Sequence, residues 1–224
     1  MIEELLPDPV VVVESFGDGE PAPLFPEEEA VVARAAAKRR REFAAVRLCA
    51  RRAMEKLDVP PQPVLPGPSG APQWPSGLAG SMTHCDGYCA AALFRAPDLA
   101  SLGIDAEPHA PLPEGVLAAT SLPGEATRLT RLAAERPEVH WDRLLFSAKE
   151  SVYKAWFPLT CRWLDFSEAD IDITPDPDDP LRGSLRAGLL VPGPWVDGHR
   201  LTTFEGRWTV RRDLVTTAIV VPHD

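Results

Sequence analysis

No stretch of this sequence approaches the roughly 18 to 20 consecutive apolar residues that a membrane-spanning helix requires. The first nine residues carry three acids, whereas a secretory signal peptide begins with basic residues followed by an apolar run. Only four cysteines are present, and without signs of secretion they predict reduced thiols rather than disulfides. We therefore expect a cytoplasmic protein that makes no contact with membranes.

Positive charge is also scarce, with 23 Lys and Arg against 33 Asp and Glu and a formal net charge of −10. This balance argues against broad nucleic-acid binding. The exception is the segment 34–56, which holds nine basic residues and only two acids. An acidic chain with one concentrated basic segment predicts an anionic ligand there, either a phosphate-rich small molecule or an acidic partner protein.

Hydrophobic residues make up 45% of the chain, enough for a packed core. Periodicity and turn residues predict helices at 27–57 (one long helix or two abutting ones) and 141–157, the second stopped by Pro158. Strands are expected at 10–13, within 81–94, at 99–107, and in a hairpin of 207–210 and 214–221. The order strand, helix, strands occurs twice, so we expect an α+β fold with two similar halves, residues 1–101 and 102–224.

Asp105 and Glu107 are the first candidate site residues. Residues two apart in a strand point to the same face, and two adjacent carboxylates repel each other unless a cation lies between them. Oxygen ligands without His or Cys favour Mg²⁺ or Mn²⁺ over zinc. An isolated pair of this kind is more often just the polar end of a strand.

Glu150 and Lys154 form an i, i+4 pair on the helix expected at 141–157. They lie opposite the apolar stripe of that helix, so the stripe can pack while Glu150 faces a cleft. The alternative is an ordinary surface ion pair, worth about 0.3–0.5 kcal/mol.

His84 and the basic helix are candidates for phosphate binding. His84 follows Ser81 and Thr83, and an imidazole that donates a proton can hold phosphate beside hydroxyl groups. A structural histidine is the plainer interpretation, and zinc binding with Cys85 and Cys89 lacks a second ligand pair. Arg40 and Arg47 lie about two helical turns apart, with Arg39 on a neighbouring face; arginine suits forked phosphate recognition, although a solvated charged face is the commoner fate.

Three motifs together resemble the 4′-phosphopantetheinyl transferases of the surfactin and enterobactin type, particularly the actinobacterial members. The motifs are Gly80-Ser81-Met82-Thr83-His84-Cys85, Gly103-Ile104-Asp105-Ala106-Glu107-Pro108, and the segment 141–155 with Lys149-Glu150-Ser151-x-Tyr153-Lys154-Ala155. The resemblance extends from residue 38 to the final strand. It implies two halves in a pseudo-twofold arrangement.

The resemblance also implies an activity and residue roles. The enzyme would transfer the phosphopantetheine arm of coenzyme A (CoA) to a serine of an acyl or peptidyl carrier protein, leaving adenosine 3′,5′-bisphosphate. Asp105, Glu107 and Glu150 would hold Mg²⁺, with Glu150 as the base. Lys154, aided by Lys149, would neutralise the pyrophosphate. The nucleotide end of CoA would lie against four residues: Arg39, Arg47, Thr83 and His84.

Two positions depart from the family pattern. Ala106 stands where some relatives have a third acid, and we expect water to fill that coordination position. Pro66 stands where some close relatives have a lysine that touches CoA. Two alternatives remain, a CoA-dependent acyltransferase and a non-enzymatic module that binds an anionic partner. With both halves in one chain, the resemblance implies a monomer.

Overall fold

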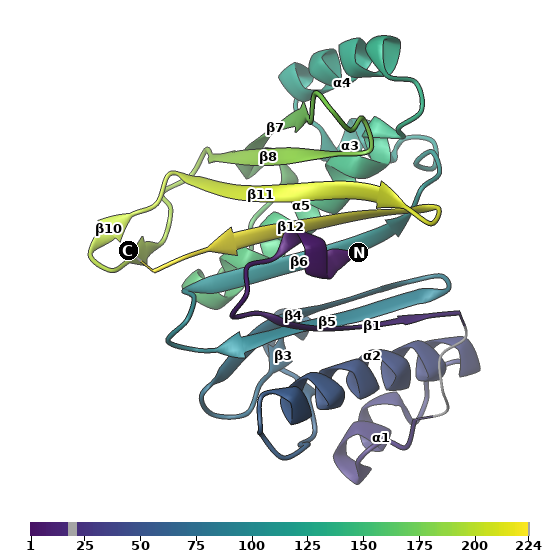
Figure 1. Ribbon diagram of the computed structural model, residues 1–224, viewed down its shortest axis with the longest axis vertical. Helices are drawn as coiled ribbons and strands as arrows, with labels where there is room; N and C mark the ends of the chain where they lie inside the picture. The colour runs from purple at the N-terminus through teal and green to yellow at the C-terminus, as the bar shows by residue number, and fades with distance from the viewer. Residues whose placement is uncertain (18–21, 224) are drawn as a thin grey trace.

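The computed structural model describes residues 1–17 and 22–223, and its N-terminal part is built on a three-stranded antiparallel sheet. The strand order is β1 (Val11–Phe16), β5 (Tyr88–Arg95) and β4 (Leu78–Cys85). The 20-residue helix α2 (Ala37–Lys56) packs along one face of this sheet, and the short α1 (Pro26–Val32) lies beside α2 (Figure 1). The expected helix at 27–57 is therefore two abutting helices.

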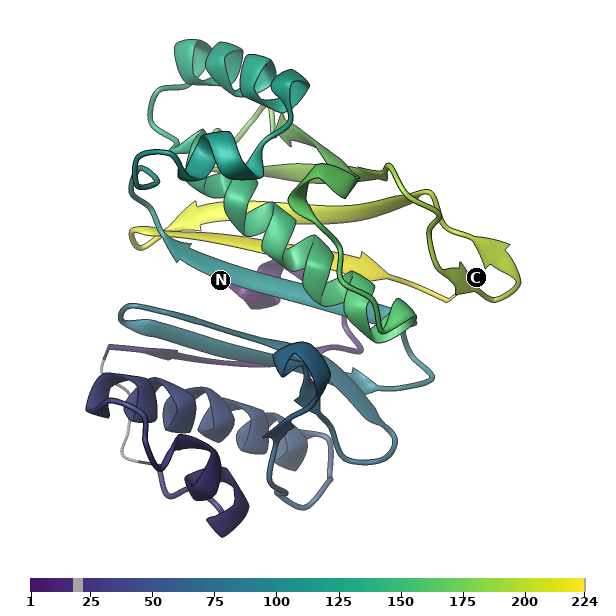
Figure 2. The same cartoon turned by 180° about the vertical axis from the view of Figure 1, so that it is seen from behind.

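The C-terminal part is built on a five-stranded antiparallel sheet. Its order is β6 (Ser101–Pro108), β12 (Leu214–Val221), β11 (Thr203–Arg211), β8 (Arg182–Leu189) and β7 (Ala169–Pro175). The 20-residue helix α5 (Trp141–Thr160) crosses one face of it, with α3 (Val116–Thr120) and α4 (Pro123–Glu135) at one end (Figure 2). Each half thus pairs one long helix with an antiparallel sheet, which confirms the α+β prediction. The exact division at residue 101 stays a prediction.

The remaining elements are short. They comprise the two-stranded pairs β2 (Leu65–Pro66) with β3 (Pro72–Gln73) and β9 (Trp195–Val196) with β10 (His199–Arg200), and the 3₁₀ turns η1 (Ile2–Leu5), η2 (Pro68–Gly70) and η3 (Phe166–Glu168). Within the described residues, no helix has the length and apolarity needed to cross a bilayer.

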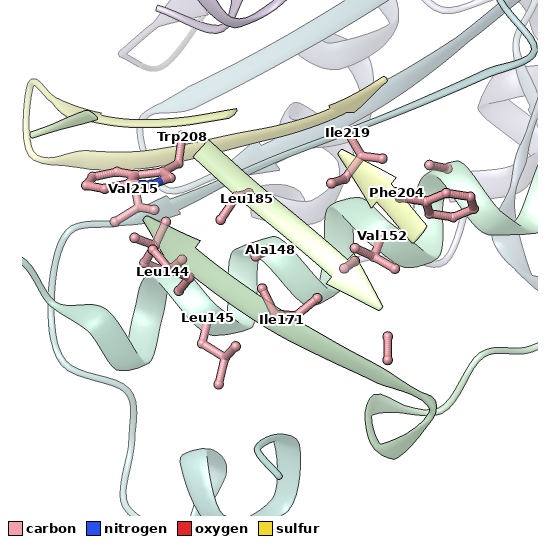
Figure 3. Packing of buried hydrophobic residues seen from close by; sticks show 14 of the residues in the cluster. Leu144, Leu145, Ala148, Val152, Ile171, Leu185, Phe204, Trp208, Val215 and Ile219 are labelled. Atoms are coloured by element: carbon pink, nitrogen blue, oxygen red, sulfur yellow. The ribbon is translucent and has the colours of Figure 1, made fainter. Parts of the chain in front are cut away.

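The apolar stripe of α5 packs on the five-stranded sheet. Figure 3 shows Leu144, Leu145, Ala148 and Val152 of α5 against strand residues that include Ile171, Leu185, Phe204, Trp208, Val215 and Ile219. On β6 the alternation of side chains puts Leu102, Ile104 and Ala106 into a separate core cluster, together with η1 and with apolar residues of β5. Asp105 and Glu107 therefore share the α5 face of β6, as the two-residue period predicts.

Strands β4 and β6 bring the two halves together through side chains. The Ser81 hydroxyl accepts a hydrogen bond from the Ile104 N–H at 3.1 Å, and the Thr83 hydroxyl accepts one from the Ala106 N–H at 3.1 Å. Both hydroxyls are buried, so they satisfy backbone donors that would otherwise be orphaned. The alternating hydroxyl residues of β4 thus join the three-stranded sheet to the five-stranded sheet.

Pro158 does not stop helix α5, and that expectation was wrong. The helix continues to Thr160 and ends where Cys161 adopts the left-handed conformation, φ 52°. A proline this close to the C-terminus removes one helical hydrogen bond but leaves the earlier turns intact. The expected C-terminal hairpin is confirmed, and its two turn residues, Arg212 and Asp213, both have positive φ, as a tight type I′ connection requires.

Candidate active site

A cleft of about 710 Å³ lies between α2 on one side and α5 on the other. Its lining comes from both halves of the chain. Five of the predicted site residues line it: Arg39, Arg47, His84, Glu150 and Lys154. Pro66 also lines it, so the predicted departure from the family pattern falls on the wall of this cleft.

Arg39 and His84 meet at one end of the cleft. The Arg39 Nη1 lies 2.5 Å from the His84 Nε2. A guanidinium can only donate, so the Nε2 must be the acceptor and the ring is neutral, with its proton on Nδ1. Burial, followed by the charge of Arg39, lowers the pKa of His84, which agrees with this tautomer. The exposed Arg39 guanidinium keeps further donors for an anion.

Arg47 lies deeper in the same wall. Its guanidinium stacks on the Phe43 ring, 3.1 Å from the ring centroid, and its Nε donates to the Val64 carbonyl at 2.9 Å. The fully buried Glu28 carboxylate lies 3.9 Å away. Burial lowers the pKa of Arg47 to about 10, still well above neutrality. The cleft therefore has a fixed positive charge in its floor.

Asp105 lies on β6, buried beneath the α5 side of the site. Its Oδ1 accepts hydrogen bonds from the Thr83 hydroxyl at 3.2 Å and from the Lys154 ammonium at 2.7 Å. Its Oδ2 accepts from the Ser147 hydroxyl at 2.8 Å. Thr83 does not line the cleft; its hydroxyl bridges β4 and β6 and touches the carboxylate from behind.

Glu107 lies two residues further along the same face of β6. Its Oε2 accepts from Arg143 of α5 at 2.9 Å. Burial and the charge of Asp105 raise the pKa of Glu107, and Arg143 opposes this shift. Arg143 also donates to the carbonyls of Ala110 and Pro111, so it ties the loop after β6 to the carboxylate.

Glu150 projects from α5 into the cleft and forms no hydrogen bond or ion pair with any described residue. Burial raises the pKa of its carboxyl; Lys154 opposes the shift and Asp105 adds to it. Asp105 thus raises the pKa of both glutamates, which places three carboxylates in one electrostatic unit. With the side chains as they stand, no three His, Cys, Asp or Glu residues in the described ranges converge on a single point.

Lys149 is not part of this group, although it neighbours Glu150 in sequence. Its ammonium points to the other side of α5, where it meets Glu125 of α4 at 2.8 Å and the carbonyls of Phe166 and Ala169 at 2.7 and 2.6 Å. Both charged groups are almost completely buried. The structure therefore places Lys149 in a tie between α5, α4 and the start of β7.

The cysteines beside His84 do not converge with it. Cys89 points toward Cys49 of α2, with 3.7 Å between the two sulfurs. Cys85 remains on the carboxylate side, where burial and the charges of Glu107 and Asp105 raise its pKa to about 12. Among the described residues, His84, Cys85 and Cys89 form no cluster that could hold a metal ion.

A small pocket of about 70 Å³ opens beside Glu150. Its lining is largely aromatic and apolar, with Tyr153, Trp163, Leu164 and Phe166. The Trp163 ring is 66% exposed and stacks near Tyr153, with 4.9 Å between the ring centroids. The Tyr153 hydroxyl is buried without a hydrogen-bond partner among the described residues.

The sequence interpretation missed Arg143, Ser147 and the apolar pocket. Arg143 and Ser147 both lie within the motif at 141–155, at positions that share a helix face with Glu150 or with each other. Their role depends on β6 lying against α5, which only the folded chain shows. Ala106, by contrast, is fully buried on the opposite face of β6, pointing away from Asp105 and Glu107.

Comparison with known proteins gives consistent matches along the chain. The profile of the 4′-phosphopantetheinyl transferase N-terminal domain matches residues 27–94, and that of the 4′-phosphopantetheinyl transferase superfamily matches residues 101–203. The chain is 58% identical to 4′-phosphopantetheinyl transferase Svp of Streptomyces mobaraensis, over 99% of this chain and 89% of Svp. It is 50% identical to 4′-phosphopantetheinyl transferase PptT of Mycobacterium tuberculosis, over 88% and 86% of the two chains. It is 47% identical to 4′-phosphopantetheinyl transferase Npt of Nocardia iowensis, over 98% and 99%.

Proposed function

Because the chain belongs to the 4′-phosphopantetheinyl transferase superfamily, we propose that the cleft between α2 and α5 binds CoA. The enzyme moves the phosphopantetheine group of CoA to a carrier protein, and its relatives favour this activity over the acyltransferase and binding-module alternatives. The observation that carries the placement is that Arg39 and Arg47 of α2 and Glu150 and Lys154 of α5 line one cleft, with Asp105 bound to Lys154 beside it. The 3′-phosphate of CoA needs cationic side chains, and its pyrophosphate needs the divalent cation that carboxylates would hold.

The nucleotide end of CoA lies at the α2 wall. Its 3′-phosphate takes donors from Arg39, which is exposed, while Arg47 supplies positive charge from the floor. His84 contributes its Nδ1 proton or, once a phosphate is near, the charged ring. Thr83 acts indirectly, since its hydroxyl is committed to the Ala106 N–H and the Asp105 carboxylate of β6.

Asp105, Glu107 and Glu150 would hold the divalent cation. The donor set fits Mg²⁺ or Mn²⁺, because it consists of carboxylate oxygens, and Glu150 has no cationic or hydrogen-bonding partner in the described chain. The cation would supply positive charge that neutralises the pyrophosphate oxygens. Water would fill the coordination position that some relatives give to a third acid, since Ala106 points to the other side of β6.

The chain's own residues prepare both the nucleophile and the leaving group. Glu150, which lines the cleft and has no hydrogen-bond partner among the described residues, removes the proton from the carrier serine hydroxyl directly or through one water. Lys154 stabilises the charge that develops on the departing adenosine bisphosphate, because its ammonium reaches into the cleft beside Asp105. Lys149 lines the small pocket beside Glu150 but is tied to Glu125, so its role is to hold α5 in place.

The groups of the pantetheine arm next to the pyrophosphate enter the small pocket beside Glu150, whose volume of about 70 Å³ is too small for the whole arm. The pocket adjoins the cleft through Glu150 and Tyr153, which line both. Its aromatic lining suits a chain of methylene and amide groups, and the unpaired Tyr153 hydroxyl offers a donor to one of those amides. This position would keep the reacting phosphorus near the carboxylates.

The carrier protein approaches from the basic side of α2. Lys38 and Arg41 are exposed near the N-terminus of that helix, outside the cleft lining. Acidic carriers would be attracted there, and association would weaken with salt. We place the enzyme in the cytoplasm and expect no role for nucleic acid. Because both walls of the cleft come from the same chain, we expect a monomer.

Mass spectrometry of an apo carrier protein tests this assignment. Incubation with CoA, MgCl₂ and the wild-type enzyme should add one phosphopantetheine group, and EDTA should prevent it. Glu150→Gln should lower turnover on the order of 10²-fold, because it removes a base and a ligand charge together. The matched control is Glu135→Gln, an exposed carboxylate at the end of α4. Equal turnover in both variants at saturating Mg²⁺ would remove Glu150 from the chemistry.

A further inference from the structure

The two oxygens of the Asp105 carboxylate are served from different directions. Oδ1 meets Lys154, which lines the cleft, and the Thr83 hydroxyl of β4. Among the described residues, Oδ2 accepts a hydrogen bond only from the Ser147 hydroxyl of α5, at 2.8 Å. The Asp105 carboxylate can rotate about χ1 and χ2. The hydrogen-bond partner of Oδ2 therefore helps to fix the direction in which Oδ1 points.

Ser147 contacts Thr217, Thr217 in turn contacts Ser151, and all three residues are fully buried. The Thr217 Oγ1 lies 2.9 Å from the Ser147 Oγ and 2.7 Å from the Ser151 Oγ. It also donates to the Ser147 carbonyl with a separation of 3.0 Å. Thr217 therefore contacts both the hydroxyl and the backbone of Ser147.

The direction of these hydrogen bonds follows from counting donors. Asp105 can only accept as a carboxylate, and Ser147 has one hydroxyl proton, so that proton goes to Asp105. Thr217 has one hydroxyl proton, which faces both the Ser147 oxygen at 2.9 Å and the Ser147 carbonyl at 3.0 Å, so Thr217 donates to Ser147 in either case. Ser151 directs its own proton to Thr217, to the hydroxyl at 2.7 Å or to the carbonyl at 3.2 Å. Ser151 and Thr217 thus donate toward Ser147, whose own proton goes to the carboxylate.

The fold leaves this network little freedom. Thr217 on β12 is directly opposite Asp105 on β6, and Ser147 and Ser151 are one turn apart on α5. Gly103 lets α5 approach closely: a Cβ on this residue would lie 2.0 Å from the Ser151 carbonyl oxygen. Helix and sheet backbones are thus in direct contact where the hydroxyls sit.

We propose that Thr217, acting through Ser147, is a positioning residue for Asp105. It keeps the Ser147 hydroxyl on Oδ2, which leaves Oδ1 directed toward Lys154 and the cleft. The inference rests on the proposed function, in which Asp105 holds the divalent cation. Partners one step removed from a metal ligand typically change metal affinity 10- to 100-fold when they are lost.

The test compares Thr217→Val, which keeps the shape but loses the hydroxyl, with Thr217→Ser, which restores the hydroxyl. The matched control is Thr216→Val on the next residue, which is equally buried but lies opposite Ala106 on the other face of the sheet. Mn²⁺ binding, followed by electron paramagnetic resonance without turnover, should weaken about tenfold in Thr217→Val. The concentration of Mg²⁺ that gives half-maximal activity should rise in parallel. Both values should stay near wild type in Thr217→Ser and Thr216→Val.

A double-mutant cycle with Asp105→Asn separates the possible outcomes. If Thr217 acts through Asp105, Thr217→Val should have little further effect on the residual turnover of Asp105→Asn. Equal losses in both backgrounds would mean a general structural role and would overturn the inference. If Asp105→Asn impairs turnover but Thr217→Val binds Mn²⁺ normally, the inference is overturned while the proposed function of Asp105 stands. Normal Mn²⁺ binding and turnover in Asp105→Asn would overturn the proposed function of Asp105 and the inference with it.

Discussion

Replacing Lys149 with methionine separates a role in folding from a role in chemistry. Methionine keeps most of the side-chain length and removes the charge. The Lys149 ammonium is 2.8 Å from the Glu125 carboxylate, and the two side chains are 2% and 0% exposed. The same ammonium satisfies the carbonyls of Phe166 and Ala169. Its loss would leave a buried carboxylate without its cation.

The expected cost follows from that burial. Breaking a buried ion pair by removing one partner typically destabilises a protein by about 3–5 kcal/mol. Backbone donors at Leu122 and Ile171 still serve Glu125, so the lower end of this range applies. For a chain of this size, 1 kcal/mol corresponds to about 2–4 °C in Tm, so Tm should fall by roughly 10 °C.

The assay pairs thermal unfolding with carrier modification measured well below the Tm. Lys149→Met should unfold early yet retain a kcat close to wild type, and Glu125→Gln in the same chain should restore part of the lost stability. Lys56→Met is the control, since Lys56 is an exposed lysine at the end of α2. An unchanged Tm with a large loss of kcat would place the ammonium in the chemistry and refute the reasoning.

Two further substitutions test the packing and the nucleotide site. Gly103→Ala should destabilise the protein by about 1–3 kcal/mol, because its new methyl group collides with the α5 backbone. Gly188→Ala is the control, since a Cβ there meets nothing closer than 3.8 Å. Equal Tm values for the two variants would contradict this packing. Arg39→Ala should raise the KM for CoA about tenfold with kcat little changed, since one charge-assisted hydrogen bond to a remote phosphate is lost. Arg41→Ala is the control for the KM for CoA. Matching KM values in the two variants would exclude Arg39 from the site. Burial, followed by the charge of Arg39, holds the pKa of His84 below its usual 6.5. In Arg39→Ala this pKa should rise, so the ring becomes charged at a higher pH. NMR titration of the ring protons measures the pKa, and an unchanged value would contradict the Arg39 contact.

Local sequence patterns were sufficient for the elements that carry the site. The apolar stripe of α5 and the two-residue period of β6 depend only on helix and strand geometry. They correctly placed Glu150 on the face opposite the stripe and Asp105 with Glu107 on one face of a strand. The turn at Arg212 and Asp213 was equally local, because the hairpin connects adjacent strands.

Local patterns could not distinguish Lys149 from Lys154. The two lysines lie on different sides of α5, and each faces a carboxylate that is distant in sequence, Glu125 in one case and Asp105 in the other. Which lysine reaches the cleft depends on where α4 and β6 pack. Thr83 illustrates the same limit, because its hydroxyl acquired a partner only when β4 came to lie beside β6.

In the proposed function, the distribution of charge favours a substrate that spans both halves of the cleft. Arg39 and Arg47 come from α2 in the N-terminal half, whereas Asp105, Glu107 and Glu150 come from the C-terminal half. The proposed phosphate site therefore belongs to one half and the proposed cation site to the other. The two groups are held in register by Ser81 and Thr83, whose hydroxyls take the place of a backbone ladder between β4 and β6. The same bonds that unite the sheets therefore set the distance between the nucleotide site and the carboxylates.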